Sequence, residues 1–78
     1  MDWHERISID PAILGGKPAI RGTRLGVEYV LELLAAGKTV ADILTGWPGL
    51  DEADVRACIA YALDAVRAER VIGYRRPA

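Results

Sequence analysis

Residues 15–24 read Gly-Gly-Lys-Pro-Ala-Ile-Arg-Gly-Thr-Arg, and they divide the chain into two parts of different character. Three glycines, a proline and three cations fall within this segment, and almost nothing in it is apolar except Ala19 and Ile20. A short segment that alternates polar and apolar residues precedes it, and about fifty residues with apolar positions at helical spacing follow. We therefore interpret the segment as a Gly-rich basic loop in front of a helical body.

The length and composition indicate one globular domain, residues 1–78. Apolar residues make up 51% of the chain and charged residues 27%, a balance typical of folded proteins. A chain of this size buries only roughly 60% of its unfolded surface, so we expect a homodimer to add stability. The formal net charge is -1, and any affinity for nucleic acid must therefore come from a local patch.

Cysteine usage and hydropathy exclude several classes of protein. Cys58 is the single cysteine, which excludes a disulfide within the chain and a cysteine-based metal site. No apolar run approaches the roughly 20 residues of a membrane span, and the first six residues are too polar for a signal peptide. We expect a cytoplasmic protein that does not enter a membrane.

Two short extended segments are predicted before the helices. Residues 6–9, Arg-Ile-Ser-Ile, alternate polar and apolar side chains and are stopped by Asp10-Pro11. A second segment is expected at Ala19–Ile20, because Pro18 fixes its own φ and favours extended backbone before it. Segments this short are unstable alone, so they must pair with each other or with a partner chain, or lie on the helices.

The first two helices are marked by apolar spacing and by their ends. The first is predicted over Val27–Ala36, with apolar residues at i, i+3, i+4 and i+7 and Gly37 as its terminator. The second follows Thr39, a good N-cap, and Asp42 can complete a capping box. It is expected to end near Thr45, before a segment rich in glycine and proline.

The third helix has the clearest start. Asp51 is the expected N-cap, acidic residues fill the first turn, and Leu50 with Val55 forms a hydrophobic staple. The helix is predicted to end near Val71, before Gly73. Its buried stripe is expected to consist of Val55, Ile59, Ala62, Leu63 and Val66.

Together these elements predict a mainly α fold. Helices of roughly ten, seven and twenty residues joined by short turns fit a tri-helical helix-turn-helix core, preceded by a small β element. Within the single domain, residues 6–26 are expected to hold the β element and the loop, residues 27–72 the helical core, and residues 73–78 a basic tail.

The loop and the helices closely resemble one family. The matching segments are Ile9 to Pro11, Gly15 to Val27 with its Gly-Lys-Pro-x-Ile-x-Gly-Thr-Arg block, Leu34 to Gly37, Asp42 to Leu44 and Trp47-Pro48. They resemble the small bacterial and archaeal proteins named domain of unknown function 433, which are similar to VapB-type antitoxins. Trp47 is a conservative departure, since the family often has tyrosine there.

This resemblance implies a homeodomain-like helix-turn-helix with a small amino-terminal β element, usually dimeric. Many members of the family sit beside a PIN-like nuclease, and an antitoxin role is inferred for them. Other members stand alone, and their role is open.

The cations of the loop, Lys17, Arg21 and Arg24, are candidates to contact nucleic-acid phosphates. A nucleotide-binding P-loop is excluded, because Pro18 follows Gly16-Lys17 and removes a backbone N–H. Two structural explanations stay open. The glycines can supply the backbone angles that fold the loop over the helices, and Arg24 can form a buried or interfacial ion pair.

The third helix is the recognition helix in a standard helix-turn-helix docking. Its start carries Asp51, Glu52 and Asp54, with Arg56 as the lone cation. Carboxylates oppose the negative potential of a phosphate-lined groove, so a core helix with an acidic cap is favoured over groove insertion. DNA binding then requires a dimer that presents the basic loops together.

The basic tail is the predicted toxin-binding element, and its candidate residues are Arg70, Tyr74, Arg75 and Arg76. PIN-type nucleases gather carboxylates around divalent metal, and an inserted guanidinium can neutralise such a cluster through bidentate pairing. The alternative is an ordinary solvated terminus.

Catalysis is not expected, and no metal site or cofactor is predicted. His4, the only histidine, lies near the start of the chain, and Cys58 is expected to be a buried, inert thiol. Trp47 is expected to pack the second turn against the core. The other aromatic candidates, for a subunit interface, are Trp3, Tyr29 and Tyr61.

We expect an antitoxin-like homodimer that binds a PIN-like nuclease and, through paired basic loops, operator DNA. This expectation rests on the family resemblance, because the residues alone indicate only a small helical binding module. The alternatives are a stand-alone dimeric helix-turn-helix regulator that binds DNA without a toxin, and a purely structural dimerisation module.

Overall fold

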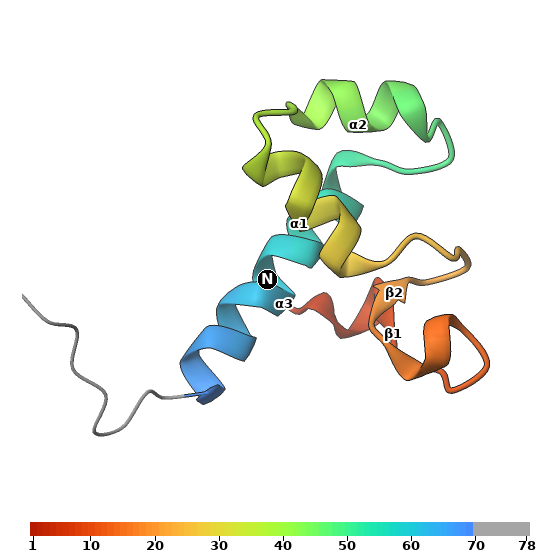
Figure 1. Cartoon of the computed structure of the whole chain (residues 1–78), viewed down its shortest axis with the longest axis vertical. Coiled ribbons are helices and arrows are strands. Elements are labelled where there is room, and N and C mark those ends of the chain that lie inside the picture. Colours follow the sequence, from red (N-terminus) through yellow and green to blue (C-terminus); the bar gives the residue numbers. More distant parts are fainter. Residues whose placement is uncertain (70–78) are drawn as a thin grey trace, which may run out of the picture.

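The order of elements places two short strands before three α-helices in the computed structural model, which describes residues 1–69 (Figure 1). The elements are η1 (Trp3–Glu5), β1 (Ile7–Ser8), η2 (Leu14–Gly16), β2 (Ala19–Ile20), α1 (Val27–Ala35), α2 (Val40–Gly46) and α3 (Glu52–Glu69), where η denotes a 3₁₀-helix. This confirms a mainly helical fold with a small antiparallel sheet near the amino terminus. The predicted tail, and the predicted end of the third helix near Val71, lie outside the described residues.

β1 and β2 pair with each other, one of the arrangements expected for segments too short to be stable alone. Ile7 faces Ile20 and Ser8 faces Ala19 in the antiparallel register. The first strand is shorter than the predicted residues 6–9, although the Arg21 N–H still donates to the Arg6 carbonyl at 2.8 Å. The pairing directs both isoleucines into the core, where they are almost fully buried.

The helix ends follow the predicted local signals. α1 ends one residue earlier than predicted, and Gly37 beyond it adopts a φ of +95°. At the start of α2, the Thr39 hydroxyl accepts from the Asp42 N–H at 3.0 Å, and the Asp42 carboxylate accepts from the Thr39 N–H at 2.9 Å. The predicted capping box is therefore present. A second reciprocal pair forms at the start of α3, between Asp51 and Asp54.

The core lies where the sheet, α1, α2 and the first half of α3 meet. Its buried residues are Ile7, Ala19, Ile20, Val27, Val30, Ile43, Val55, Ala57 and Cys58. Trp47, which ends α2, packs against this cluster as predicted. Among residues 1–68 no polar or charged side chain is buried. No helix of the described residues has the length and hydropathy needed to cross a membrane.

The buried stripe predicted for α3 is wrong at three of its five positions. The residues concerned are Ile59, Leu63 and Val66, whose exposed fractions are 47%, 46% and 67%. Besides Val55, α3 buries Ala57 and Cys58 completely. Small side chains let helix backbones approach closely, so α3 presents them to the core and turns its larger apolar residues away. Beyond the core, α3 projects from the body of the molecule (Figure 1).

Candidate binding surfaces

Arg21, a predicted phosphate contact, is tied into the fold. Its guanidinium donates to three backbone carbonyls, those of His4 at 2.8 Å, Glu5 at 3.1 Å and Ile7 at 3.2 Å. These bonds fasten the turn after β2 to η1 and β1. The structure thus gives Arg21 a structural role and does not join it to Lys17 and Arg24 in one strip.

The turn that carries Arg21 explains the glycine beside it. The Thr23 N–H donates to the Ile20 carbonyl at 3.0 Å and closes a four-residue turn. Gly22 is the third of the four residues and has a φ of +80°. Glycine adopts a positive φ at this position of a β-turn without strain. The Thr23 hydroxyl donates to the same carbonyl and accepts from the Leu25 N–H. The Gly-Thr pair of the motif therefore shapes the loop, as the structural explanation proposes.

Arg6 forms an ion-pair clamp that sequence reasoning missed. Its Nη1 lies 3.0 Å from an Asp51 oxygen and 3.1 Å from an Asp54 oxygen, so the residue before β1 holds the start of α3. The hydrogen bond to Asp54 raises the pKa of Arg6. The pKa of Asp51 is lowered, first by the backbone N–H of Asp54 and then by Arg6. The polar–apolar alternation gave no signal of this pair, because its members lie 45 residues apart.

The charged side chains at the start of α3 form ion pairs with residues of opposite charge. Arg56, the candidate DNA contact of this helix, forms an ion pair with Glu52 one turn earlier. Asp51 and Asp54 cap the helix and bind Arg6. Because each carboxylate here has a local partner, the acidic start is a capping device, as favoured from the sequence.

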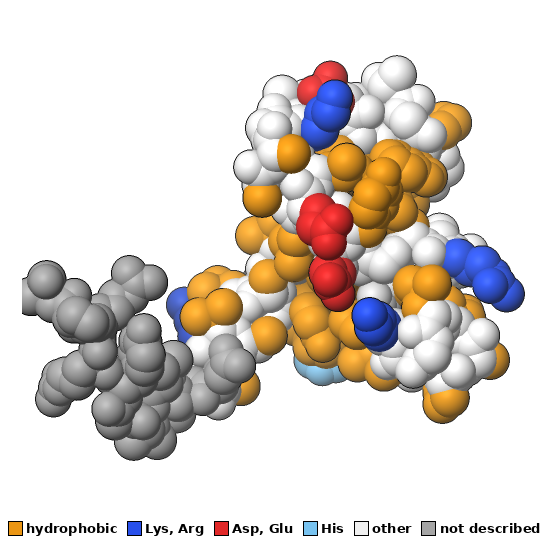
Figure 2. All heavy atoms as spheres, viewed as in Figure 1, with side chains coloured by type: hydrophobic (Ala, Val, Ile, Leu, Met, Phe, Trp, Pro, Cys, Tyr) orange, Lys and Arg blue, Asp and Glu red, His pale blue; other side chains and the backbone are white. Residues whose placement is uncertain are grey.

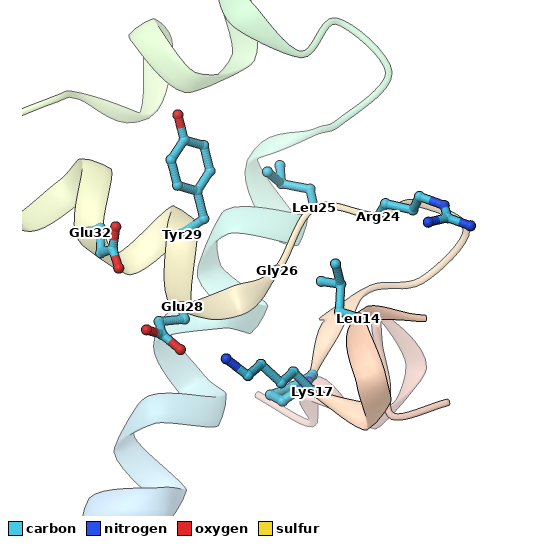
Figure 3. A pocket seen from close by; sticks show the side chains of 9 residues that line it. Leu14, Lys17, Arg24, Leu25, Gly26, Glu28, Tyr29 and Glu32 are labelled. Atoms are coloured by element: carbon cyan, nitrogen blue, oxygen red, sulfur yellow. The ribbon is translucent and has the colours of Figure 1, made fainter. Parts of the chain in front are cut away.

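Lys17 and Arg24 lie beside a groove of about 570 Å³ between the Gly-rich loop and α1 (Figure 3). Glu28 and Glu32 of α1 line its other side. The apolar lining consists of Leu14, Pro18, Leu25, Gly26 and Tyr29. Figure 3 shows Lys17 extending toward Glu28, whereas Arg24 points away along the loop. We call this feature the loop–α1 groove.

Backbone geometry places an apolar side chain on the rim of the loop–α1 groove. Leu14 has a φ of +51°, a left-handed conformation that is uncommon for a residue with a side chain. Its Cδ1 would lie only 3.2 Å from a Cβ added at Gly26, so the glycine leaves room for the leucine. Leu14 nevertheless remains 39% exposed.

The aromatic candidates divide between intrachain contacts and the surface. The Trp3 indole N–H donates to Asp64 at 2.8 Å, and its ring meets Tyr61 edge-on at 4.7 Å. Trp3 and Tyr61, predicted for a subunit interface, thus contact each other within the chain. Tyr29 meets Trp47 edge-on at 5.8 Å and remains 46% exposed beside the loop–α1 groove.

Cys58 is a buried thiol, as predicted. Desolvation raises its pKa to about 11, and the negative charge of Asp54 adds to the effect. A thiol in this state is a poor nucleophile, since the thiolate is the reactive form. Within residues 1–69, no group of three or more His, Cys, Asp or Glu side chains is arranged to hold a metal ion.

Two surfaces therefore stand out on the described part of the chain. One is the loop–α1 groove. The other, which we call the distal α3 face, consists of Ile59, Leu63 and Val66. On the side seen in Figure 2, apolar surface lies between separate acidic and basic groups, and no continuous basic patch is visible over residues 1–69.

These features define a small, mainly helical domain whose prominent surfaces, over residues 1–69, are a groove with charges of both signs and an exposed apolar helix face. The chain belongs to the family described as Protein of unknown function (DUF433), whose model matches residues 7–62. The resemblance to domain of unknown function 433 noted from the sequence is thus confirmed.

Two known proteins are similar to this chain. The uncharacterized protein y4eO of Sinorhizobium fredii (strain NBRC 101917 / NGR234) is 43% identical over 58 residues, which cover 74% of this chain and 26% of that protein. The chain therefore spans about a quarter of the length of this curated relative. The crystal structure of a DUF433 member protein from Anabaena variabilis ATCC 29413 is similar, with a TM-score of 0.72 and 28% identity, over 88% of this chain and 69% of that one.

Proposed function

We propose that this chain is an antitoxin-like homodimer of helix-turn-helix type that binds and neutralises a PIN-like nuclease. The observation that carries the proposal is the distal α3 face. Its three apolar residues are spaced i, i+4 and i+7 on a helix that projects from the body, and each is about half exposed or more. An amphipathic helix with an open apolar face is the form in which many helices enter a groove on a partner.

The candidate tail residues extend this surface in sequence. Arg70, Tyr74, Arg75 and Arg76 follow directly after α3 and lie outside the described residues. We propose that the distal α3 face anchors the nuclease and that Arg75 and Arg76 pair with carboxylates of its metal site. Anchoring by apolar contacts supplies affinity, whereas the guanidinium groups supply inhibition.

A second candidate is a stand-alone dimeric helix-turn-helix regulator that binds DNA without a toxin. The succession of α1, α2 and α3 with short connections supports it, as do the exposed cations Lys17 and Arg24. The paired charges at the start of α3 argue against insertion of that helix into a DNA groove. In such a regulator the basic loops of the dimer would contact the DNA phosphates, and the affinity for DNA would fall steeply with salt concentration.

The test is a pull-down of the tagged full chain from its own cells, with mass spectrometry of the bound proteins and a nuclease assay on the complex. We expect a small nuclease in stoichiometric amount. The variant Leu63→Asp/Val66→Asp should lose roughly tenfold or more in affinity, because each side chain loses an interface contact worth about 1 kcal/mol, roughly half of the free energy of full burial. The matched control is Ala68→Asp, an exposed position on the opposite side of α3.

Two further results decide between the proposals. A chain lacking Arg75 and Arg76 should still bind the nuclease but no longer inhibit it. Recovery of the chain alone would overturn the antitoxin proposal, and a salt titration against the chain's own promoter would then test the DNA-binding regulator.

A further inference from the structure

The loop–α1 groove has no role in nuclease binding as proposed above, yet it carries charges of both signs. Lys17 and Arg24 stand on the loop side, and Glu28 and Glu32 stand on the α1 side. None of these four residues forms an ion pair with another residue of the range 1–68. Their formal charges sum to zero, which does not favour a polyanion such as nucleic acid.

The chain itself carries the charge pattern that complements this groove. In a dimer with two-fold symmetry, the same patch meets itself in opposite orientation, so that residue i contacts j and j contacts i. Two cations on one side and two carboxylates on the other become complementary to themselves under such a rotation. Lys17 and Arg24 of one copy would then face Glu28 and Glu32 of the other.

The shape and the apolar lining agree with this arrangement. The loop forms a rim next to the groove, and Leu14, 39% exposed, stands on that rim in its left-handed conformation. Leu14 also lines the groove, so the loop side offers apolar surface to a second copy. Tyr29, 46% exposed, lies in the groove, and aromatic residues are enriched in the centres of protein interfaces.

We propose that a second copy of this chain docks on the loop–α1 groove, with the loop rim of each copy seated in the groove of the other. The inference rests on the homodimer named in the proposed function, and it does not depend on a nuclease. It assigns Lys17 and Arg24 to the interface between copies, where each faces the carboxylates of α1.

The test uses two charge-reversed full-length chains and sedimentation equilibrium. One chain carries Lys17→Glu/Arg24→Glu, so its groove holds only acidic residues, and the other carries Glu28→Lys/Glu32→Lys, so its groove holds only basic residues. Circular dichroism checks that both remain helical. We expect the wild-type chain to be dimeric and each variant alone to dissociate at least roughly tenfold more readily, because like charges then face each other.

The decisive sample is an equimolar mixture of the two variants. Every facing pair in the mixed dimer has opposite charges, so the mixture should regain dimers that contain one copy of each variant. The control chain, Glu5→Lys/Lys38→Glu, alters exposed residues outside the groove and should dimerise like the wild type.

Three results would overturn the inference, and each has a different meaning. Variants that dimerise like the wild type would place the dimer interface elsewhere and leave the homodimer intact. Monomeric variants that form no mixed dimer would show that the four charges do not face each other. A wild-type chain that is monomeric at all concentrations would overturn the homodimer itself, while nuclease binding would remain testable by the pull-down.

Discussion

At the scale of single residues, two arginines join parts of the chain that are far apart in sequence. Arg6 binds the start of α3 through Asp51 and Asp54. Arg21 donates hydrogen bonds to three backbone carbonyls of η1 and β1. Arg21 uses two nitrogens of its planar guanidinium, a geometry that the single ammonium group of lysine lacks. The amino-terminal segment is therefore held by polar contacts in addition to the two isoleucines of the sheet.

Two glycines in the chain are expected to respond to substitution in opposite directions. Gly22→Ala should lower the free energy of unfolding by about 1 kcal/mol, because its φ of +80° is unfavourable for a residue with a Cβ. Gly46→Ala should raise it by about 0.5 kcal/mol, because Gly46 ends α2 with no positive φ and an added Cβ meets no atom within 4 Å. Urea denaturation of the two variants measures both values. Equal effects would show that backbone conformation is not what selects Gly22.

At the scale of elements, α3 has a buried side and an exposed side. The buried side is part of the core, where Ala57 and Cys58 allow close packing, and the exposed side carries the distal α3 face from Ile59 onward. The residue types thus reverse the usual expectation, since small side chains are buried and larger apolar ones are exposed. This exposed face is the surface that we propose binds the nuclease.

Two isoleucines in different helices test this division. Ile43→Val in α2 removes a methyl group from a side chain that is 1% exposed, and we expect a loss of about 1 kcal/mol in the free energy of unfolding. Ile59→Val in α3 makes the same change where the side chain is 47% exposed, and we expect a change within about 0.5 kcal/mol. Chemical denaturation of the isolated chain provides both numbers. A large loss for Ile59→Val would mean that the distal α3 face is covered in the free protein.

Features set by neighbouring residues could be predicted from the sequence. The capping box of Thr39 and Asp42, the N-cap at Asp51 and the terminator Gly37 all act within one turn of backbone, so their signals are local. The orientation of α3 could not be predicted in this way. Helical spacing marks apolar residues but does not say which of two adjacent helix faces meets the core. In α3 the face with the smaller side chains packs against the core.

The candidate surfaces show the same limit. The cations Lys17, Arg21 and Arg24 lie close in sequence, yet a turn between them sends Arg21 toward η1 and leaves the other two beside the groove. The carboxylates that share that groove come from α1, and only the fold brings them near the loop. The sequence thus identified the charged residues but not which other residues lie near them in the fold.

At the scale of the whole molecule, carboxylates at helix starts link the fold to pH. The pKa of each of three such carboxyls is lowered, chiefly by backbone N–H donors: Asp2 before η1, Asp42 in α2 and Asp51 before α3. Protonation of these groups weakens the start of each helix at once. The folded state therefore depends on their negative charge.

This linkage has a definite sign. A carboxyl whose pKa is lower in the folded state stabilises the fold above its ordinary pKa of 3.8, and this stabilisation is lost as the pH falls through the lower folded pKa. We expect the thermal midpoint to be constant above that range and to fall below it. Asp51→Asn, which can still cap the helix, should make the fall shallower, and calorimetry between neutral and acidic pH measures it. An unchanged acid limb in this variant would show that Asp51 does not contribute.

The single cysteine of the chain can report how often the domain opens. Cys58 is fully buried where α3 packs against the core, and its raised pKa of about 11 keeps it in the unreactive thiol form. A thiol reagent can attack only after the first half of α3 has left its neighbours, so the rate of labelling counts openings of the domain. Because the chain contains a single cysteine, each molecule can be labelled only once. Mass spectrometry of the labelled fraction over time then gives the opening rate of the native protein without an introduced probe.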